Sequence, residues 1–351
     1  MSVSSRLEII RVARPAMGTR FEFVLHGGRP EALRAAGEEA LDEIERIENA
    51  LSLYRPHTDI ARINAGAALG PVRVAPETFR LLERARALTH RTLGAFDVTA
   101  GPLVQAWGFH GGNGVRLDPT ALARARDASG WSQVLLDASA TAVRFAAGNP
   151  GLLDLGAIGK GYALDRAAEV LREAGVTSAL LHGGTSTIVA LGTPPGADAW
   201  TVAIASGPDP DKGTNQDREP TEGQVLSDGP DAHQGTGALS AHAHLQRDRC
   251  SDAPNRGTGP LLSVRLREES LSVSAVWGRA FRDAEGQLLG HVLDPRTGLP
   301  VAGAGLAAVV LPSAEESDAV STALLVLGQA GIPELASRFP QLRCWVDPCR
   351  I

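Results

Sequence analysis

The spacing of apolar residues along the chain predicts a mixture of short strands and amphipathic helices. Residues Thr19–Leu25 alternate apolar and polar side chains, with both phenylalanines on one face, which is typical of a strand with one buried side. In Glu31–Ser52 the apolar residues mostly recur every three or four positions, which predicts a long amphipathic helix. Pro56 cannot continue this helix, because a proline disfavours helical geometry at the residue before it.

The same two periodicities predict the rest of the secondary structure. Further helices are expected at Pro76–Thr92, Pro119–Ala128, Gly159–Ala174 and Ser313–Leu327. Further strands are expected at Gln133–Leu136, Ala142–Phe145, Ser178–His182, Ser186–Leu191, Trp200–Ala205, Leu261–Arg267, Leu271–Ser274, Leu289–Leu293, Gly305–Leu311 and Arg343–Val346. This order favours an α+β fold, with mixed and largely antiparallel sheets, over a strict alternation of parallel strands and helices.

One long segment breaks the pattern. Ser206–Pro260 is rich in Gly, Pro, Asp, Gln, His and Thr and has almost no large apolar residues. Such a segment cannot bury enough surface to offset the entropy lost on ordering it. We therefore predict a disordered insertion at residues 206–260, inside one domain of residues 15–351, with an N-terminal arm at residues 1–14.

Composition and charge exclude several classes of function. The 351 residues include 34 Lys and Arg against 40 Asp and Glu, a net charge of −6, which argues against a nucleic-acid-binding protein. No stretch approaches the roughly 18–20 apolar residues of a membrane helix, and residues 1–14 contain no signal peptide or lipobox. On this evidence the protein is predicted to be cytoplasmic.

The segment Asp154–Asp165, DLGAIGKGYALD, is richer in glycine than packing requires. A small-residue turn leads into a helix whose first N–H groups are free and whose dipole favours an anion. Lys160 adds a positive charge that is unfavourable for the helix itself, so an anionic ligand is one explanation. The spacing is not that of a P-loop, and a tight turn with a surface lysine is the alternative.

Asp318 and Thr322 are four residues apart on a predicted helix and therefore share a face. A carboxylate with a hydroxyl oxygen suits a hard cation such as Mg²⁺ or Ca²⁺. The alternative is that Asp318 caps or pairs locally while Thr322 bonds its own helix backbone.

Six short segments, taken in order, resemble the ApbE family, the FAD:protein FMN transferases. They are Met17-Gly18-Thr19, Tyr54-Arg55-Pro56, Gly94-Ala95-Phe96-Asp97, Asp154–Asp165, His291–Gly298 and Asp318–Thr322. The resemblance spans nearly the whole chain apart from residues 206–260. It implies a T-fold-like α+β architecture and a Mg²⁺-dependent enzyme that takes FAD as its substrate.

The resemblance also implies a reaction and a partner. FAD is cleaved at its pyrophosphate, and FMN is attached through a phosphoester to a Thr or Ser hydroxyl of an acceptor flavoprotein, while AMP leaves. The acceptor is expected to be a membrane redox subunit or an FMN-binding domain protein.

Site residues follow from the same resemblance, motif by motif. Met17, Tyr54, Ala95, Phe96 and Asp97 would line the FAD site, Lys160 would reach its phosphates, the backbone oxygen of Ala157 with Asp318 and Thr322 would hold the metal, and His291 would lie near the pyrophosphate. The acceptor hydroxyl needs a proton acceptor. We prefer His291 for this role, with Asp294 or the metal-bound Asp318 as alternatives.

Two other functions stay open at this point. The same site could use water as the acceptor, which would make the protein an FAD diphosphatase that yields FMN and AMP. A non-catalytic flavin-binding or assembly protein is the other. Its motivation is the sequence Gly183-Gly184-Thr185-Ser186, where many family members have Gly-Gly-Asp.

Overall fold

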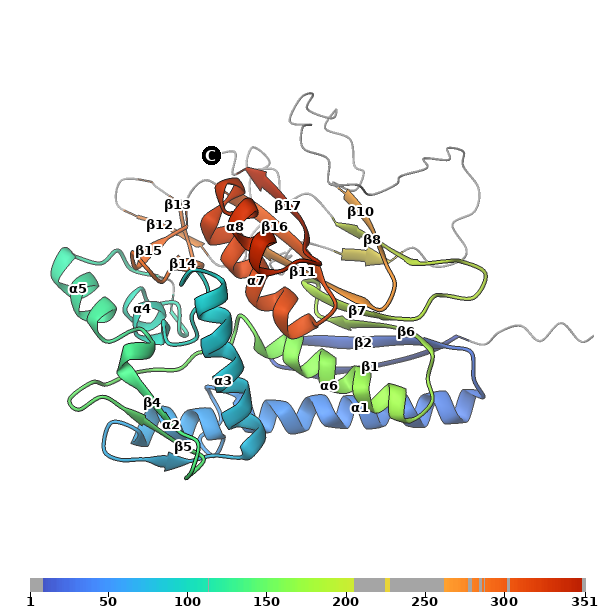
Figure 1. Cartoon of the computed structure of the whole chain (residues 1–351), viewed down its shortest axis with the longest axis horizontal. Helices are drawn as coiled ribbons and strands as arrows, with labels where there is room; N and C mark the ends of the chain where they lie inside the picture. The colour runs from blue at the N-terminus through green and yellow to red at the C-terminus, as the bar shows by residue number, and fades with distance from the viewer. Residues whose placement is uncertain are drawn as a thin grey trace, which may run out of the picture.

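A seven-stranded antiparallel sheet forms the centre of the molecule, with the strand order β1-β2-β6-β7-β11-β16-β17 (Figure 1). The computed structural model describes residues 9–112, 114–204, 225–227, 262–276, 280–283, 286, 288–301 and 304–348. The strands are β1 (Ile10–Ala16), β2 (Thr19–His26), β6 (Ser178–Gly183), β7 (Thr187–Leu191), β11 (Glu269–Ala275), β16 (Ala304–Leu311) and β17 (Arg343–Pro348).

Three helices cover one face of this sheet: α1 (Pro30–Leu51), α6 (Gly159–Glu173) and α7 (Ala314–Leu327) (Figure 1). The apolar stripe predicted for α1 is the face it buries, through residues such as Ile44 and Ile47. These side chains join one large core with Phe21 and Phe23 of β2. The helix packing therefore follows from the 3–4 spacing of apolar residues.

A smaller sheet covers the opposite face. Its order is β10 (Leu262–Leu266), β8 (Trp200–Ile204), β9 (Val225–Ser227). A second core lies between the two sheets and includes Ile188, Val202 and Val310. Because successive side chains of a strand point to opposite faces, a sheet covered on both sides needs apolar residues at nearly every position.

Strand β11 departs from this rule on its helix-facing side. Leu271 and Val273 belong to the core between the sheets, whereas Ser270 and Ser272 alternate with them and are 0% exposed. These serines face α7, as does Thr187 of the neighbouring strand β7, whereas Val309 and Leu311 of β16 are apolar on this side. A buried polar layer therefore separates β11 from α7.

The remaining elements form a second group on one side of the sheet (Figure 1). Its helices are α2 (Asp59–Gly66), α3 (Pro76–Arg91), α4 (Gly101–Ala106) and α5 (Pro119–Asp127). The last helix, α8 (Ile332–Arg338), follows α7 and packs against it. Its strands are β3 (Val72–Arg73), β4 (Val134–Asp137), β5 (Ala142–Phe145), β12 (Ala280–Arg282), β13 (Leu288–Gly290), β14 (Leu293–Asp294) and β15 (Leu299–Pro300). A third core around Leu103, Trp107 and Phe109 holds α4, α5 and β13 together.

The α+β prediction is confirmed, and several predicted boundaries change. Residues 10–14, predicted to lie in an arm, belong to β1, an edge strand that tolerates Pro15. The prediction of one continuous strand at Leu289–Leu293 is wrong. Strand β13 ends at Gly290 and β14 begins at Leu293, so His291 lies between two strands. The predicted insertion at 206–260 lies outside the described residues except for β9.

Among the described helices, none is by itself long and apolar enough to cross a membrane. Helix α7 and the following Gln329–Arg338 meet the length and composition test as a pair bent by 119°.

Candidate active site

The carboxylate of Asp165 on α6 holds the start of α7. It accepts hydrogen bonds from the Ser313 hydroxyl at 2.7 Å and from the backbone N–H groups of Ala314 and Glu315 at 2.8 and 2.9 Å. These amides have no partner within their own helix, so Asp165 acts as a cap supplied by a neighbouring helix. Burial raises the pKa of the Asp165 carboxyl, while the three hydrogen bonds favour its charged form.

Gly161 allows α6 and α7 to approach at the point where both carry predicted site residues. A Cβ at this position would lie 2.1 Å from the Ala314 carbonyl oxygen and 2.9 Å from the Cβ of Asp318. Because no side chain fits there, the two helices meet backbone to backbone. This contact places Lys160, the preceding residue, beside Asp318.

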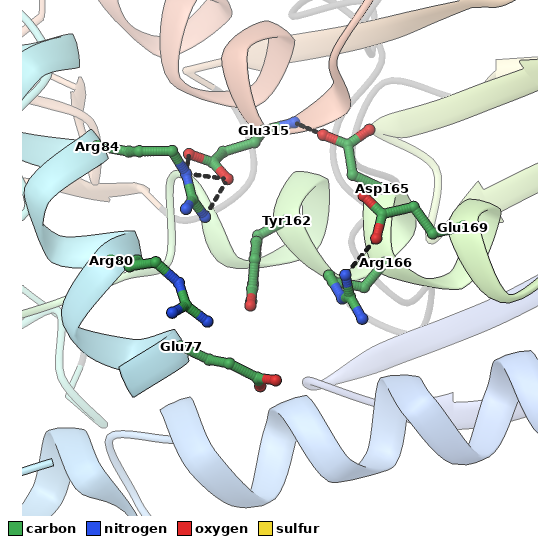
Figure 2. Close-up of a pocket in the computed structure, with 8 residues that line it drawn as sticks. All are labelled: Glu77, Arg80, Arg84, Tyr162, Asp165, Arg166, Glu169 and Glu315. Atoms are coloured by element: carbon green, nitrogen blue, oxygen red, sulfur yellow. Dashed lines mark hydrogen bonds and ion pairs between the residues drawn. The ribbon is translucent and has the colours of Figure 1, made fainter. Parts of the chain in front are cut away.

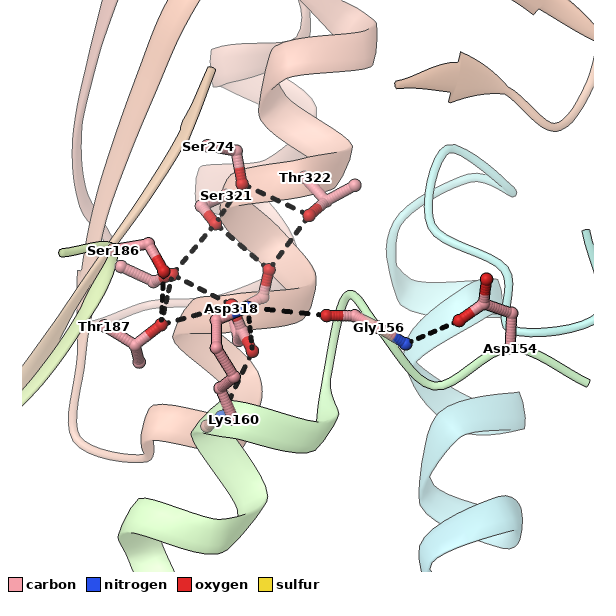
Figure 3. A network of polar contacts seen from close by, with 11 residues as sticks. Asp154, Gly156, Lys160, Ser186, Thr187, Ser274, Asp318, Ser321 and Thr322 are labelled. Carbon is pink, nitrogen blue, oxygen red and sulfur yellow. Dashed lines mark hydrogen bonds and ion pairs between the residues drawn. The ribbon is translucent and has the colours of Figure 1, made fainter. Parts of the chain in front are cut away.

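The structure brings the predicted residues Lys160 and Asp318 together (Figure 3). Asp318 is 4% exposed, and its Oδ2 accepts a hydrogen bond from the Gly161 N–H at 3.1 Å. Lys160 Nζ lies 4.0 Å from the same oxygen and donates to the Gly156 carbonyl at 3.5 Å. The lysine therefore turns back over the start of α6 toward the buried carboxylate.

The other Asp318 oxygen is held by hydroxyl groups of two strands. Ser272 on β11 donates to Oδ1 at 3.1 Å. Thr187 on β7 donates to the same oxygen at 3.4 Å (Figure 3). Our sequence reasoning missed both residues. The available signal was serine at alternate positions of a strand whose other side chains are apolar.

Thr322 lies one turn beyond Asp318, and its Oγ1 donates to the Asp318 backbone carbonyl at 3.3 Å. It is also 3.2 Å from the Ser274 hydroxyl. The backbone bond that we gave as the alternative for Thr322 is therefore present. Asp318, in contrast, reaches across to the strands and to α6 instead of capping its own helix.

The described residues contain no group of three or more His, Cys, Asp or Glu side chains that could hold a metal ion. The predicted ligand set has one such side chain, Asp318, together with the Thr322 hydroxyl and the carbonyl of the half-buried Ala157. These are all hard oxygen donors, and the Asp318 carboxylate is held in one orientation. The donor chemistry therefore fits a cation such as Mg²⁺.

The residues predicted to line the FAD site do not all present their side chains. Met17 is half-buried in the β1–β2 turn at a φ of 51°. Ala95 and Phe96 are each 1% exposed and pack in the main core, so neither side chain lies at the surface. Tyr54 lies after α1 with 72% of its surface exposed.

Asp97 organises the turn that follows α3. Its Oδ1 accepts from the N–H of Thr99 at 2.8 Å and from the Thr99 hydroxyl at 2.7 Å. Burial raises the pKa of the Asp97 carboxyl. The next residue, Val98, accepts a hydrogen bond from the Asp154 N–H at 2.8 Å, so this turn adjoins the segment that leads to Lys160.

His291 and Asp294 have different environments. The half-buried His291 ring meets the Phe109 ring edge-on at 6.4 Å between centroids. Both oxygens of Asp294 are bound by the Arg296 guanidinium at 2.9 and 2.8 Å, and Oδ1 also accepts the Arg296 N–H. Asp294 therefore closes this turn through its pair with Arg296.

A second histidine lies close to the same segments. His110 Nε2 is 2.8 Å from Asp154 Oδ2, and the other oxygen of Asp154 accepts the Gly156 N–H at 2.8 Å. The Gly156 carbonyl in turn accepts a hydrogen bond from the Lys160 ammonium group. A chain of polar contacts therefore connects His110 with Lys160. This pair could not be predicted from local sequence features, because 44 residues separate its members.

A polar pocket of about 340 Å³ lies among α3, α6 and α7 (Figure 2). Its lining is Glu77, Arg80, Arg84, Tyr162, Asp165, Arg166, Glu169 and Glu315, none of them a predicted site residue. Arg84 forms a bidentate pair with Glu315 at 2.8 and 2.9 Å and lies over the Tyr162 ring. These side-chain contacts join α3, α6 and α7, and they therefore hold together the helices that carry Lys160 and Asp318.

Known structures share this architecture. The ApbE protein of Thermotoga maritima superposes with a TM-score of 0.75 at 23% sequence identity, covering 97% of this chain and 94% of that one. The apo flavinyl transferase ApbE of Pseudomonas stutzeri superposes with a TM-score of 0.73 at 22% identity, covering 100% and 94%. The fold is therefore the one seen in flavin transferase structures.

Sequence comparison gives the same family. The ApbE family model matches residues 17–230 and 244–346, so the chain belongs to the ApbE family. The FAD:protein FMN transferase of Treponema pallidum is 28% identical over 344 residues, which are 96% of this chain and 82% of the relative. That of Rhodobacter capsulatus is 30% identical over 283 residues, which are 80% of this chain but 44% of the relative.

Proposed function

We propose that this chain is a metal-dependent FAD:protein FMN transferase. It moves the FMN part of FAD to a Thr or Ser hydroxyl of an acceptor protein and releases AMP. The observation that carries the proposal is the position of Lys160 against the buried Asp318, at the start of α6. Two relatives over most of this chain bear the name FAD:protein FMN transferase, which supports the same reaction.

The reaction is a phosphoryl transfer between two oxygens. The acceptor hydroxyl oxygen forms a bond to the FMN phosphorus, the bond from that phosphorus to the bridging oxygen breaks, and AMP leaves with the electron pair. Such a transfer depends on charge neutralisation and in-line positioning more than on a strong nucleophile. In this proposal the Lys160 ammonium group binds the pyrophosphate.

The hydroxyl proton needs an acceptor as the new bond forms. His291 is the residue we assign to this role, because Arg296 occupies both oxygens of Asp294. The edge-on contact with Phe109 limits how the His291 ring turns. A neutral imidazole nitrogen takes the proton and can later return it to solvent.

Asp318, Thr322 and the carbonyl of Ala157 would hold a Mg²⁺ ion. When bound, the ion supplies positive charge at the phosphates and neutralises charge that develops in the transition state. The hydrogen bonds to Asp318 from Ser272 and Gly161 keep its carboxylate in a fixed orientation for this purpose.

The proposal is tested with purified protein, FAD, MgCl₂ and an FMN-binding domain protein from the same genome. We expect one AMP released for each FMN bound covalently to the acceptor, measured by chromatography and intact-protein mass. The acceptor protein must carry the FMN on a Thr or Ser. EDTA should stop the reaction, and added MgCl₂ should restore it.

Asp318→Ala should lower turnover by roughly 100-fold or more while FAD affinity changes much less, because the charge it supports develops in the transition state. Asp198→Ala is the matched control, since this exposed aspartate pairs only with Arg265 on the surface among the described contacts.

In the assay of the original protein, free FMN without labelled acceptor would select the diphosphatase reaction. FAD binding with no AMP release would select a non-catalytic flavin-binding protein.

A further inference from the structure

The helix-facing side of β11 places a hydroxyl group directly on the Asp318 carboxylate. Ser272 is 0% exposed and donates to Asp318 Oδ1 at 3.1 Å. Thr187, also 0% exposed, donates to the same oxygen from β7 at 3.4 Å, and the two hydroxyls are 3.4 Å apart. Two neighbouring strands therefore converge on one carboxylate oxygen, inside a protein interior where unpaired polar groups are costly.

Ser272 donates its hydroxyl proton to Asp318. A hydroxyl has one proton, so toward Ser321, at 3.2 Å, Ser272 is the acceptor. Ser321 can accept in turn from Ser274 at 2.8 Å. Ser321 also donates to the Asp318 backbone carbonyl at 3.0 Å, so in this row of hydroxyls it is Ser272 that donates to the Asp318 carboxylate.

A carboxylate with one oxygen held by two strands cannot rotate freely. Its second oxygen, Oδ2, accepts a hydrogen bond from the Gly161 N–H at 3.1 Å and lies 4.0 Å from Lys160 Nζ. We infer that Ser272, assisted by Thr187, is a positioning residue that fixes Asp318 so that Oδ2 faces Lys160, and that it thereby sets the rate of flavin transfer. The inference rests on the function proposed above.

Ser270 shows what a purely structural serine in this layer does. It lies two residues earlier on the same face of β11, is also 0% exposed, and bonds the Leu311 carbonyl at 2.8 Å and the Ser317 hydroxyl of α7 at 2.7 Å. It does not bond Asp318. Ser270 therefore provides a control with equal burial and an equal connection to α7.

We expect Ser272→Ala to lower kcat by roughly tenfold and to weaken Mg²⁺ binding, while KM for FAD stays within about twofold, since hydrogen-bond partners of metal ligands contribute this much. Ser270→Ala should leave kcat and Mg²⁺ affinity within about twofold of the original. Both variants should lose similar amounts of thermal stability. The measurements are steady-state flavin transfer, titration calorimetry with MgCl₂ and thermal unfolding.

Crystal structures of the two variants give a readout that does not need activity. The Asp318 carboxylate should be rotated or disordered in Ser272→Ala and unchanged in Ser270→Ala. If the original protein transfers no flavin, the proposed function fails, and an unchanged carboxylate in Ser272→Ala would separately overturn the positioning role.

Equal losses of kcat in the two variants would also overturn it, since that result means a structural role for both serines. If Ser272→Ala does not fold, Ser272→Cys is the second variant, because its side chain is similar in size and its thiol is a weaker donor. Its kcat should fall between that of the original protein and the tenfold lower value, and full activity in this variant would contradict the inference.

Discussion

Lys160 is an unusual residue for this chain. Lysine occurs at positions 160 and 212 only, and the other 32 of the 34 Lys and Arg residues are arginine. A compact ammonium group fits between the Gly156 carbonyl and Asp318, where the planar fork of an arginine would need more space. With 23% of its side chain exposed, Lys160 can be reached by a ligand from solvent.

The scarcity of lysine makes a residue-level test direct. If Lys160 binds the pyrophosphate, FAD at about ten times its dissociation constant should slow acylation of Lys160 by an amine reagent roughly tenfold, since only unbound protein reacts. Peptide mass spectrometry gives the labelling rate at each lysine.

Lys212 and riboflavin are the controls for this experiment. Labelling of Lys212 should not change with FAD, and riboflavin, which has no phosphate, should not protect Lys160. Equal labelling of Lys160 with and without FAD would remove it from the phosphate site.

At the scale of elements, the site depends on how closely α6 approaches α7. Asp165 caps α7 from α6, and Gly161 lies against the backbone of α7. The Arg84–Glu315 pair ties α3 to the same helix. The geometry of Lys160 and Asp318 is therefore a property of the helix contact, not of either helix alone.

Gly161→Ala tests this contact. Its Cβ would lie 2.1 Å from a backbone oxygen that cannot move aside as a flexible side chain could. We expect a loss of about 3 kcal/mol in the free energy of unfolding, at the upper end for overpacking, together with a loss of flavin transfer. Urea unfolding and the transfer assay measure the two effects.

Gly159→Ala is the matched control on the same helix. Nothing lies within 4 Å of a Cβ built there, so its stability should change by no more than about 1 kcal/mol. Similar effects of the two substitutions would show that the close approach at Gly161 does not matter.

At the scale of the whole molecule, two sheets and three helices form a layered body, and Lys160 and Asp318 lie on the helix side of the large sheet. The small sheet covers the other side and buries Ile188 and Val310. Strands β8 and β10 pair directly, with Ile204 opposite Leu262. Ile204 and Leu262, which flank residues 205–261 in the sequence, are therefore neighbours across one antiparallel pair.

This pairing predicts that residues 205–261 can be replaced by a short Asn-Gly turn. The turn would close β8 and β10 as a hairpin. The shorter loop should lower the free-energy cost of loop closure by about 3 kcal/mol, which opposes the loss of β9. We expect soluble protein with a melting temperature within a few degrees of the original, as measured by calorimetry.

The control is a deletion that extends through both strands, from Trp200 to Leu266. It would expose the core between the sheets, and we expect insoluble protein. Loss of soluble protein in the first, shorter deletion would show that the removed residues pack against the rest.

Local sequence features predicted much of the fold and part of the site. The 3–4 spacing in α1 and the alternation in β2 depend on neighbouring residues, so both elements were predicted almost to their ends. The glycine-rich start of α6 and the Asp318–Thr322 spacing were visible for the same reason. The interruption at His291 was not, because the segment Leu289–Leu293 has the pattern of one strand until its partners are known.

The sequence by itself therefore determined the periodic elements, the order of the motifs and the placing of a lysine at a helix start. Only the tertiary structure decided what surrounds that lysine. Thr187 reaches Asp318 from 131 residues away and Ser272 from 46. Periodicity tells which face of a strand or helix is buried, but the chemical partner across the interface depends on how sheet and helices pack, and that is settled by the whole core.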